Sequence, residues 1–209
     1  MSPVLFASMQ GQNANVPQTS GLDWIADNIN NSSDSTAVFF RLHEALQVFQ
    51  AESENEALSQ VYNFMAHWHN LYGHMDSAIY YIALSLPYYR NSQPKEKLAH
   101  LNLTLAGYYS SAAMYARALD VVFESLELFR DLDDQRGIAL AYASICDLLY
   151  SEYRFEEGNE YCDQAIAIQM QLDLQEDLAI TYRRKSANLL FIEGQTENAL
   201  AVIKQAIAI

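Results

Sequence analysis

Small and apolar residues recur along the chain with a period of about 40 residues. Val38, Ala78, Ala118, Gly158 and Ala199 each open the same pattern, in which an apolar-rich stretch follows; the first three intervals are 40 residues and the last is 41. A fixed period between about 20 and 50 residues is typical of stacked repeat units. The pattern therefore predicts a solenoid, a fold whose extended surface usually holds a partner.

Inside each period the apolar positions follow helical spacing. The second unit carries Tyr62, Met65, Ala66 and His69 at intervals of three and four residues, which predicts a helix over 57–69. Residues 72–76 predict a turn, and Asp76 or Ser77 is expected to cap the next helix. Each unit is therefore expected to hold two antiparallel helices.

The expected inward face of these helix pairs carries mainly small and aliphatic side chains. In the second helix of the second unit the inward positions are Ala78, Ile82, Ser85 and Leu86. In the third unit they are Leu105, Ala106, Tyr109, Ala118, Val122, Ser125 and Leu126, and in the fourth they are Tyr142, Ile145, Cys146, Leu149, Gly158, Cys162, Ala165 and Ile166. The fifth unit has Ala187, Leu190, Ala199, Ile203, Ala206 and Ile207. A first, degenerate unit keeps the register with Leu22, Ile25, Ala26, Ile29, Val38, Leu42, Ala45 and Leu46.

Five units in one register resemble the tetratricopeptide repeat family over roughly residues 19–209. The resemblance rests on the small residue in the first helix, the small residue that opens the second, and the aromatic-rich stripe. It implies an all-α, right-handed superhelical solenoid of antiparallel helix pairs, with units near 19–58, 59–98, 99–138, 139–179 and 180–209.

Two features depart from the family's usual pattern. The period exceeds the commonest 34 residues by about six, which implies longer helices or longer connections, as at 94–98 and 131–137. The usual proline after the second helix is absent. The long unit resembles the variety of this family that is common in signalling proteins.

The charge narrows the range of partners. With 12 basic and 26 acidic residues the chain has a formal net charge of −14, which repels nucleic acid and anionic lipid headgroups. A cationic or neutral peptide is compatible with this field, although the charge equally serves ordinary solubility. No apolar run approaches the roughly 20 residues of a membrane helix, so direct membrane insertion is not expected.

The two ends of the sequence suggest a larger context. Residues 1–18 read as a flexible leader, and 2–8 are similar to the end of a signal peptide, which favours a trimmed export signal over an unstructured leader. Residues 199–209 form an apolar second helix with no polar capping helix after it. We therefore expect either that the native polypeptide continues or that a second copy covers this end as a homodimer.

The resemblance also implies where a ligand binds, because the concave groove of these repeats is lined by the face of each first helix that is not packed inward between the helices. Transferring that face to this chain gives a polar set that could grip an extended peptide or protein segment; an ordinary solvated face is the alternative. The positions are Asn63, His67, Asn70, Thr104, Ser111, Asp147, Tyr150, Arg184, Lys185 and Asn188.

Three adjacent basic residues, Arg183, Arg184 and Lys185, stand out in an acidic chain. Arg184 and Lys185 with Asn188 could pair with a ligand carboxylate, because arginine offers a bidentate fork. The alternative is a local salt bridge with residues 175–177. The earlier repeats lack the basic and asparagine set of the family's carboxylate-clamp subclass.

No residue pattern predicts chemistry. Glycine-rich phosphate loops, nucleophile elbows and His-Glu-x-x-His pairs are absent from the sequence, so no catalytic residue and no cofactor are expected. His67 and His69 are two positions apart on a helix and face different sides, which argues against a metal site. Cys146 and Cys162 are expected to be buried free thiols; a disulfide across the helix pair is the alternative if the protein is exported.

These observations together favour a non-catalytic peptide- or protein-binding module. We expect it to be the periplasmic or otherwise extracytoplasmic sensor region of a larger bacterial signal-transduction protein, of the histidine kinase or nucleotide cyclase type. The alternative is a cytoplasmic scaffold or peptide-responsive regulator.

Overall fold

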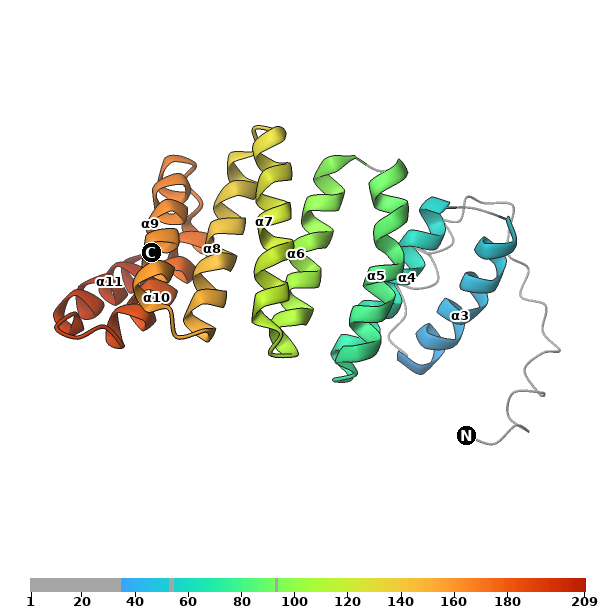
Figure 1. The fold of residues 1–209 in the computed structure, drawn as a ribbon, viewed down its shortest axis with the longest axis horizontal. Coiled ribbons are helices and arrows are strands. Elements are labelled where there is room, and N and C mark those ends of the chain that lie inside the picture. The colour runs from blue at the N-terminus through green and yellow to red at the C-terminus, as the bar shows by residue number, and fades with distance from the viewer. Residues whose placement is uncertain (1–34, 53–54, 93) are drawn as a thin grey trace. The chain divides into compact units, whose positions relative to one another are not determined.

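A computed structural model describes residues 35–52, 55–92 and 94–209, and within these ranges the secondary structure is helical, with no strand (Figure 1). This confirms the predicted all-α class. The leader predicted over 1–18 and the first helix of the first unit lie outside the described residues. The helices are α3 (Ser35–Glu52), α4 (Asn55–Leu71), α5 (Met75–Ser92), α6 (Lys95–Ser111), α7 (Tyr115–Asp131), α8 (Gln135–Ser151), α9 (Phe155–Gln171), α10 (Gln175–Leu190) and α11 (Thr196–Ala208).

The helix lengths explain the 40-residue period. Helices α6, α7, α8 and α9 each have 17 residues. Three residues separate each of them from the next helix. Two such helices and two such turns make one period. The six residues by which the unit exceeds the commonest repeat therefore lie in longer helices, since the connections at 94–98 and 131–137 are short.

Each of these turns ends the preceding helix in the same way. In the α6–α7 turn, the amide of Ala113 donates to Ser110 O and the amide of Met114 donates to Tyr109 O, at 2.9 and 2.8 Å. This is the Schellman pattern, which needs one residue in the left-handed region. That position holds Gly73, Ala113, Asp133, Tyr153 and Asp173, with φ between 54° and 74°. The longer α10–α11 turn also has a left-handed residue, Gly194 with φ of 77°, but its hydrogen bonds differ.

The chain forms two compact units, residues 1–61 and 62–209. In the first unit, Leu42, Ala45 and Phe49 make the buried face of α3. In the second unit, helices α6 to α11 pack each against the next in antiparallel fashion (Figure 1).

Most of the predicted inward positions of the middle repeats are buried, whereas Leu86, Tyr109 and Tyr142 are half-buried. Ala66, Ala78, Ala118, Val122, Ser125, Ile145 and Cys162 all have 0% exposure. Small residues here allow close approach of the helices. At Gly137 the approach is so close that a Cβ there would lie 2.2 Å from the ring of Phe129.

Two predictions fail locally. Helix α5 begins at Met75, so Asp76 and Ser77 lie inside its first turn rather than at its cap position. In the fifth unit Leu190 and Ile207 are 58% and 77% exposed, because they lie on faces of α10 and α11 that the neighbouring described helices do not cover. In the described part of the chain, no helix is long and apolar enough to cross a bilayer.

Candidate functional site

A groove of about 780 Å³ lies among helices α8, α10 and α11. We call it the C-terminal groove. Its apolar side chains include Ala187, Leu190, Leu200 and Ile203, and its lining also holds Asp147, Tyr150, Arg183, Arg184, Ser186, Thr196, Glu197 and Ala199. An apolar hollow with a few polar groups on its walls is the usual form of a binding site.

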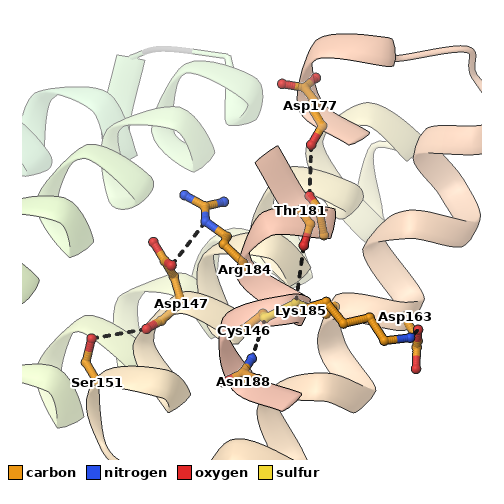
Figure 2. The surroundings of a disulfide bond; sticks show 10 residues. Cys146, Asp147, Ser151, Asp163, Asp177, Thr181, Arg184, Lys185 and Asn188 are labelled. Atoms are coloured by element: carbon orange, nitrogen blue, oxygen red, sulfur yellow. Dashed lines mark hydrogen bonds and ion pairs between the residues drawn. A yellow bond between two sulfur atoms is a disulfide. The ribbon is translucent and has the colours of Figure 1, made fainter. Parts of the chain in front are cut away.

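Three residues predicted from the sequence meet in this groove. Asp147 and Tyr150 come from α8, and Arg184 comes from the neighbouring first helix, α10. Arg184 Nε lies 3.1 Å from Asp147 Oδ1 (Figure 2). Their side chains are 32% and 51% exposed, so the pair is worth only about 0.2–1 kcal/mol. A ligand carboxylate or cation can therefore replace either partner at small cost.

Two residues predicted on the same face do not reach the groove. Lys185 points the other way and forms an ion pair with Asp163 of α9 (Figure 2). Asn188 has 0% exposure, and its Nδ2 donates to Cys146 Sγ at 3.3 Å. The adjacent basic residues do not form the local salt bridge with residues 175–177. Arg184 and Lys185 bind acids of the neighbouring helices α8 and α9, not residues 175–177 of their own helix.

The remaining predicted residues lie on earlier helices. Asn63 and Thr104 line a smaller hollow of about 390 Å³ with Tyr89, Glu96 and His100. Asn63 Nδ2 donates to the hydroxyl of Tyr89 at 2.8 Å. His67 and Ser111 are exposed, and Asn70 is half-buried. The ten predicted positions thus lie in the C-terminal groove, in the smaller hollow and elsewhere on the first helices of the repeats.

A disulfide joins Cys146 of α8 to Cys162 of α9, which corrects the expectation of free thiols (Figure 2). Both cysteines have 0% exposure. At the corresponding places, 40 residues earlier, stand Ala106 and Val122. The two inward positions face each other where the helices cross, so two cysteines there are close enough to bond. Cys162 carries no thiol proton in this state, and its 3.9 Å approach to Thr181 O is a packing contact.

Four aromatic rings gather beside the C-terminal groove, and we call them the aromatic corner: Tyr150, Tyr153, Phe155 and Phe191. Phe155 and Phe191 stack with ring centroids 4.9 Å apart, and Tyr150 contacts both at 5.7 and 5.8 Å. Tyr153 meets Phe155 edge-on at 6.1 Å. Tyr153 and Phe191 are 81% and 60% exposed.

Sequence reasoning missed both the apolar part of the groove and the aromatic corner. The repeat pattern assigned Ala187, Leu190 and Ile203 to packing between helices, whereas the structure places them in the groove wall. One feature of the sequence could have indicated the aromatic corner. Tyr153 and Phe191 are large aromatic residues at turn positions, where polar residues and glycine are usual.

Side chains that could coordinate a metal ion do not gather in the part of the chain that the structure describes. Within it, no group of three or more His, Cys, Asp or Glu side chains is placed to hold a metal ion.

Comparison with known proteins identifies the fold. No protein-family model matches the sequence, and no curated protein matches it either. Among solved structures, BtubC (BKLC) from P. vanneervenii superposes with a TM-score of 0.75 at 24% identity, covering 90% of this chain and 77% of that one. A STAND signal-transduction ATPase with a tetratricopeptide repeat sensor, from Pyrococcus horikoshii, superposes with a TM-score of 0.81 at 14% identity.

A third similar structure is a Rap protein complexed with competence and sporulation factor, with a TM-score of 0.62 at 17% identity. This chain is covered to 92% by the ATPase and 90% by the Rap protein, but spans only 31% and 51% of their respective lengths. At these identities the likeness concerns the fold. The chain has the tetratricopeptide repeat fold, a stack of helix pairs that presents an extended surface.

Proposed function

We propose that this protein is a non-catalytic module that binds a peptide or protein segment in the C-terminal groove. The observation that carries the proposal is the convergence of Asp147, Tyr150 and Arg184 on an apolar hollow of about 780 Å³. The apolar surface of Leu190, Leu200 and Ile203 supplies affinity through burial, and the polar groups orient the ligand.

The groove is open and its polar groups come from different helices. An extended segment lying along it meets α8 first and α10 next, so small changes in helix packing alter the contacts. Ligand binding is therefore able to favour one packing of α8, α10 and α11 over another. A module of this kind suits a sensor, in which the change passes to another domain.

The wider proposal is that the module is the extracytoplasmic sensor region of a larger bacterial signal-transduction protein of the kinase or cyclase type. The disulfide between Cys146 and Cys162 supports it, because disulfides persist in oxidising compartments and are rare in the cytosol. The STAND ATPase, whose repeat region is a sensor, offers an analogy.

A cytoplasmic scaffold is the rival proposal, and the cysteines separate the two. In cells that express the full-length protein, periplasmic fractionation combined with maleimide labelling of denatured protein reports location and oxidation state together. The export proposal requires an extracytoplasmic protein whose cysteines react only after reduction. A cytoplasmic protein with two reactive thiols would sustain the scaffold instead.

Peptide binding is tested by selecting ligands from a random dodecapeptide phage library on the purified chain. A selected peptide is synthesised and titrated by calorimetry against the parent protein, Leu190→Glu and Leu172→Glu. Leu190 lines the groove, whereas Leu172 is 43% exposed at the α9–α10 turn and serves as the matched control. We expect at least a tenfold loss for Leu190→Glu and less than twofold for Leu172→Glu. Failure to select any peptide, or equal loss in both variants, contradicts the proposal.

A further inference from the structure

We infer that the aromatic corner docks a cationic side chain, arginine in preference to lysine, of the ligand that occupies the C-terminal groove. The inference rests on the proposed function and names the chemistry of that ligand. Tyr150 belongs to both surfaces, since it lines the groove and contacts Phe155 and Phe191. A segment that leaves the groove past Tyr150 therefore meets the corner next.

Tyr153 occupies a backbone position where a large side chain is unusual. Tyr153 is 81% exposed and occupies the left-handed turn position, with φ of 62°. The corresponding turns place Gly73 and Ala113 there, neither of which carries a bulky side chain. A bulky residue is unfavourable in this conformation, and its exposed ring buries little surface in return. Strained, exposed residues of this kind are typical of functional surfaces.

Several carboxylates stand close in sequence to the rings, and Arg154, between Tyr153 and Phe155, is paired with two of them. Arg183 and Arg184 of α10 line the groove itself, and Arg184 is paired with Asp147. Arg154 contacts Glu152 at 3.0 Å and Glu157 at 2.6 Å. Its hydrogen bonds to Glu157 and Glu152 raise the pKa of the guanidinium above its ordinary value. Glu156, next to Phe155, and Glu193, two residues after Phe191, are both exposed. Glu197 adds a third carboxylate on the groove side.

Rings and carboxylates together select a cation. The face of an aromatic ring attracts a positive charge, and arginine also stacks its planar guanidinium on such a face. The flanking carboxylates add attraction and accept the hydrogen bonds of the guanidinium. The same charges disfavour a second copy of this chain, because its net charge of −14 would bring like charges together.

The test uses a blocked hexapeptide of alternating arginine and glycine and the same peptide with citrulline in place of arginine. Citrulline keeps the shape and removes the charge. Calorimetry compares both peptides on the parent chain, on Tyr153→Gly and on Glu156→Gln/Glu193→Gln. The charge control is Asp133→Asn/Asp173→Asn, which removes two carboxylates at the opposite turns and keeps residues that tolerate positive φ.

We expect the arginine peptide to bind at least tenfold more tightly than the citrulline peptide. Tyr153→Gly should weaken it about two- to fivefold, the range of one exposed cation–π contact. Glu156→Gln/Glu193→Gln should weaken it at least as much, and the charge control less than twofold. The melting temperature of Tyr153→Gly should not fall, which separates a lost contact from a damaged fold.

Each of the following results overturns the inference. If the two peptides bind equally, or neither binds, the site does not recognise a positive charge. If the charge control loses as much affinity as Glu156→Gln/Glu193→Gln, the attraction comes from the net charge of the whole molecule and not from these carboxylates. If analytical sedimentation shows a dimer of the parent chain and Tyr153→Gly dissociates it, the aromatic corner binds a second copy of the chain instead. If a library-selected peptide depends on Leu190 but not on Tyr153, the proposed function stands and this inference fails. If neither residue matters, both fail.

Discussion

Single residues in the turns decide how much backbone strain each repeat carries. Tyr153 and Gly194 both lie in the left-handed region, two residues before the second helix of successive units, with φ of 62° and 77°. A Cβ at Gly194 would meet nothing within 4 Å, so backbone conformation alone sets the effect of a substitution there. The two positions therefore form a matched pair.

We predict opposite effects on stability at these two positions. Gly194→Ala should lower the free energy of unfolding by about 1 kcal/mol, because alanine is unfavourable in the left-handed region. Tyr153→Gly should leave that free energy unchanged or raise it by up to about 1 kcal/mol. Urea denaturation followed by circular dichroism measures both. A loss of more than about 1 kcal/mol in Tyr153→Gly would show that the tyrosine ring has a structural role.

Two helical glycines give a second contrast, between packing and helix propensity. Gly137 lies against the buried ring of Phe129, and a Cβ there would come within 2.2 Å of a ring carbon. Gly107 is exposed on α6, and a Cβ there would meet nothing within 4 Å. We expect Gly137→Ala to destabilise the protein by about 1–3 kcal/mol. Gly107→Ala should stabilise it by about 0.5–1 kcal/mol.

Thermal melts of these two variants test the packing. Equal effects would mean that the close approach of α7 and α8 at Gly137 is not present in solution.

At the scale of elements, the disulfide joins the two helices of the fourth unit at the place where other units use small and aliphatic residues. Ala106 and Val122 fill the corresponding positions of the third unit, and both are buried. Cys146→Ala/Cys162→Val therefore removes the covalent bond and keeps a packing that the chain already uses. The cysteines are 16 residues apart.

We predict that this double variant loses about 3 kcal/mol of unfolding free energy, the loop-closure contribution of a bridge of this length. The parent protein with reductant should lose a similar amount. Denaturation with and without dithiothreitol measures both quantities. A parent protein that is insensitive to dithiothreitol and equal in stability to the variant would show that the bridge does not form in solution.

The elements were the most predictable part of the structure. Residues such as Ile82, Val122 and Ile145 face the core at helical spacing, and spacing depends on the sequence alone. The disulfide was not predictable, because Cys146 and Cys162 at inward positions pack equally well as free thiols. Lys185 and Asn188 were misplaced because the direction of a side chain depends on its partners in neighbouring helices, here Asp163 and Cys146.

The aromatic corner illustrates the remaining limit. Tyr150 and Phe191 are 41 positions apart and meet only through the packing of α8 against α10. Periodicity shows that such positions belong to adjacent units. It does not show which turn residues fold toward one another.

At the scale of the whole molecule, the acidic charge and the groove act together. A net charge of −14 attracts cationic ligands over distance, and this attraction weakens with salt. The affinity that comes from burying the apolar surface of the groove does not weaken with salt in that way. A peptide held mainly by Leu190, Leu200 and Ile203 should therefore keep most of its affinity at high ionic strength, whereas the contribution of the aromatic corner should fall.

Amide hydrogen exchange with a library-selected peptide shows whether the C-terminal groove is the ligand site. Exchange of the purified chain is compared with and without saturating peptide. The account predicts slower exchange in the segments of α8, α10 and α11 that line the groove, and little change in α7 away from it. Protection confined to other helices, or no protection at saturation, would contradict the account.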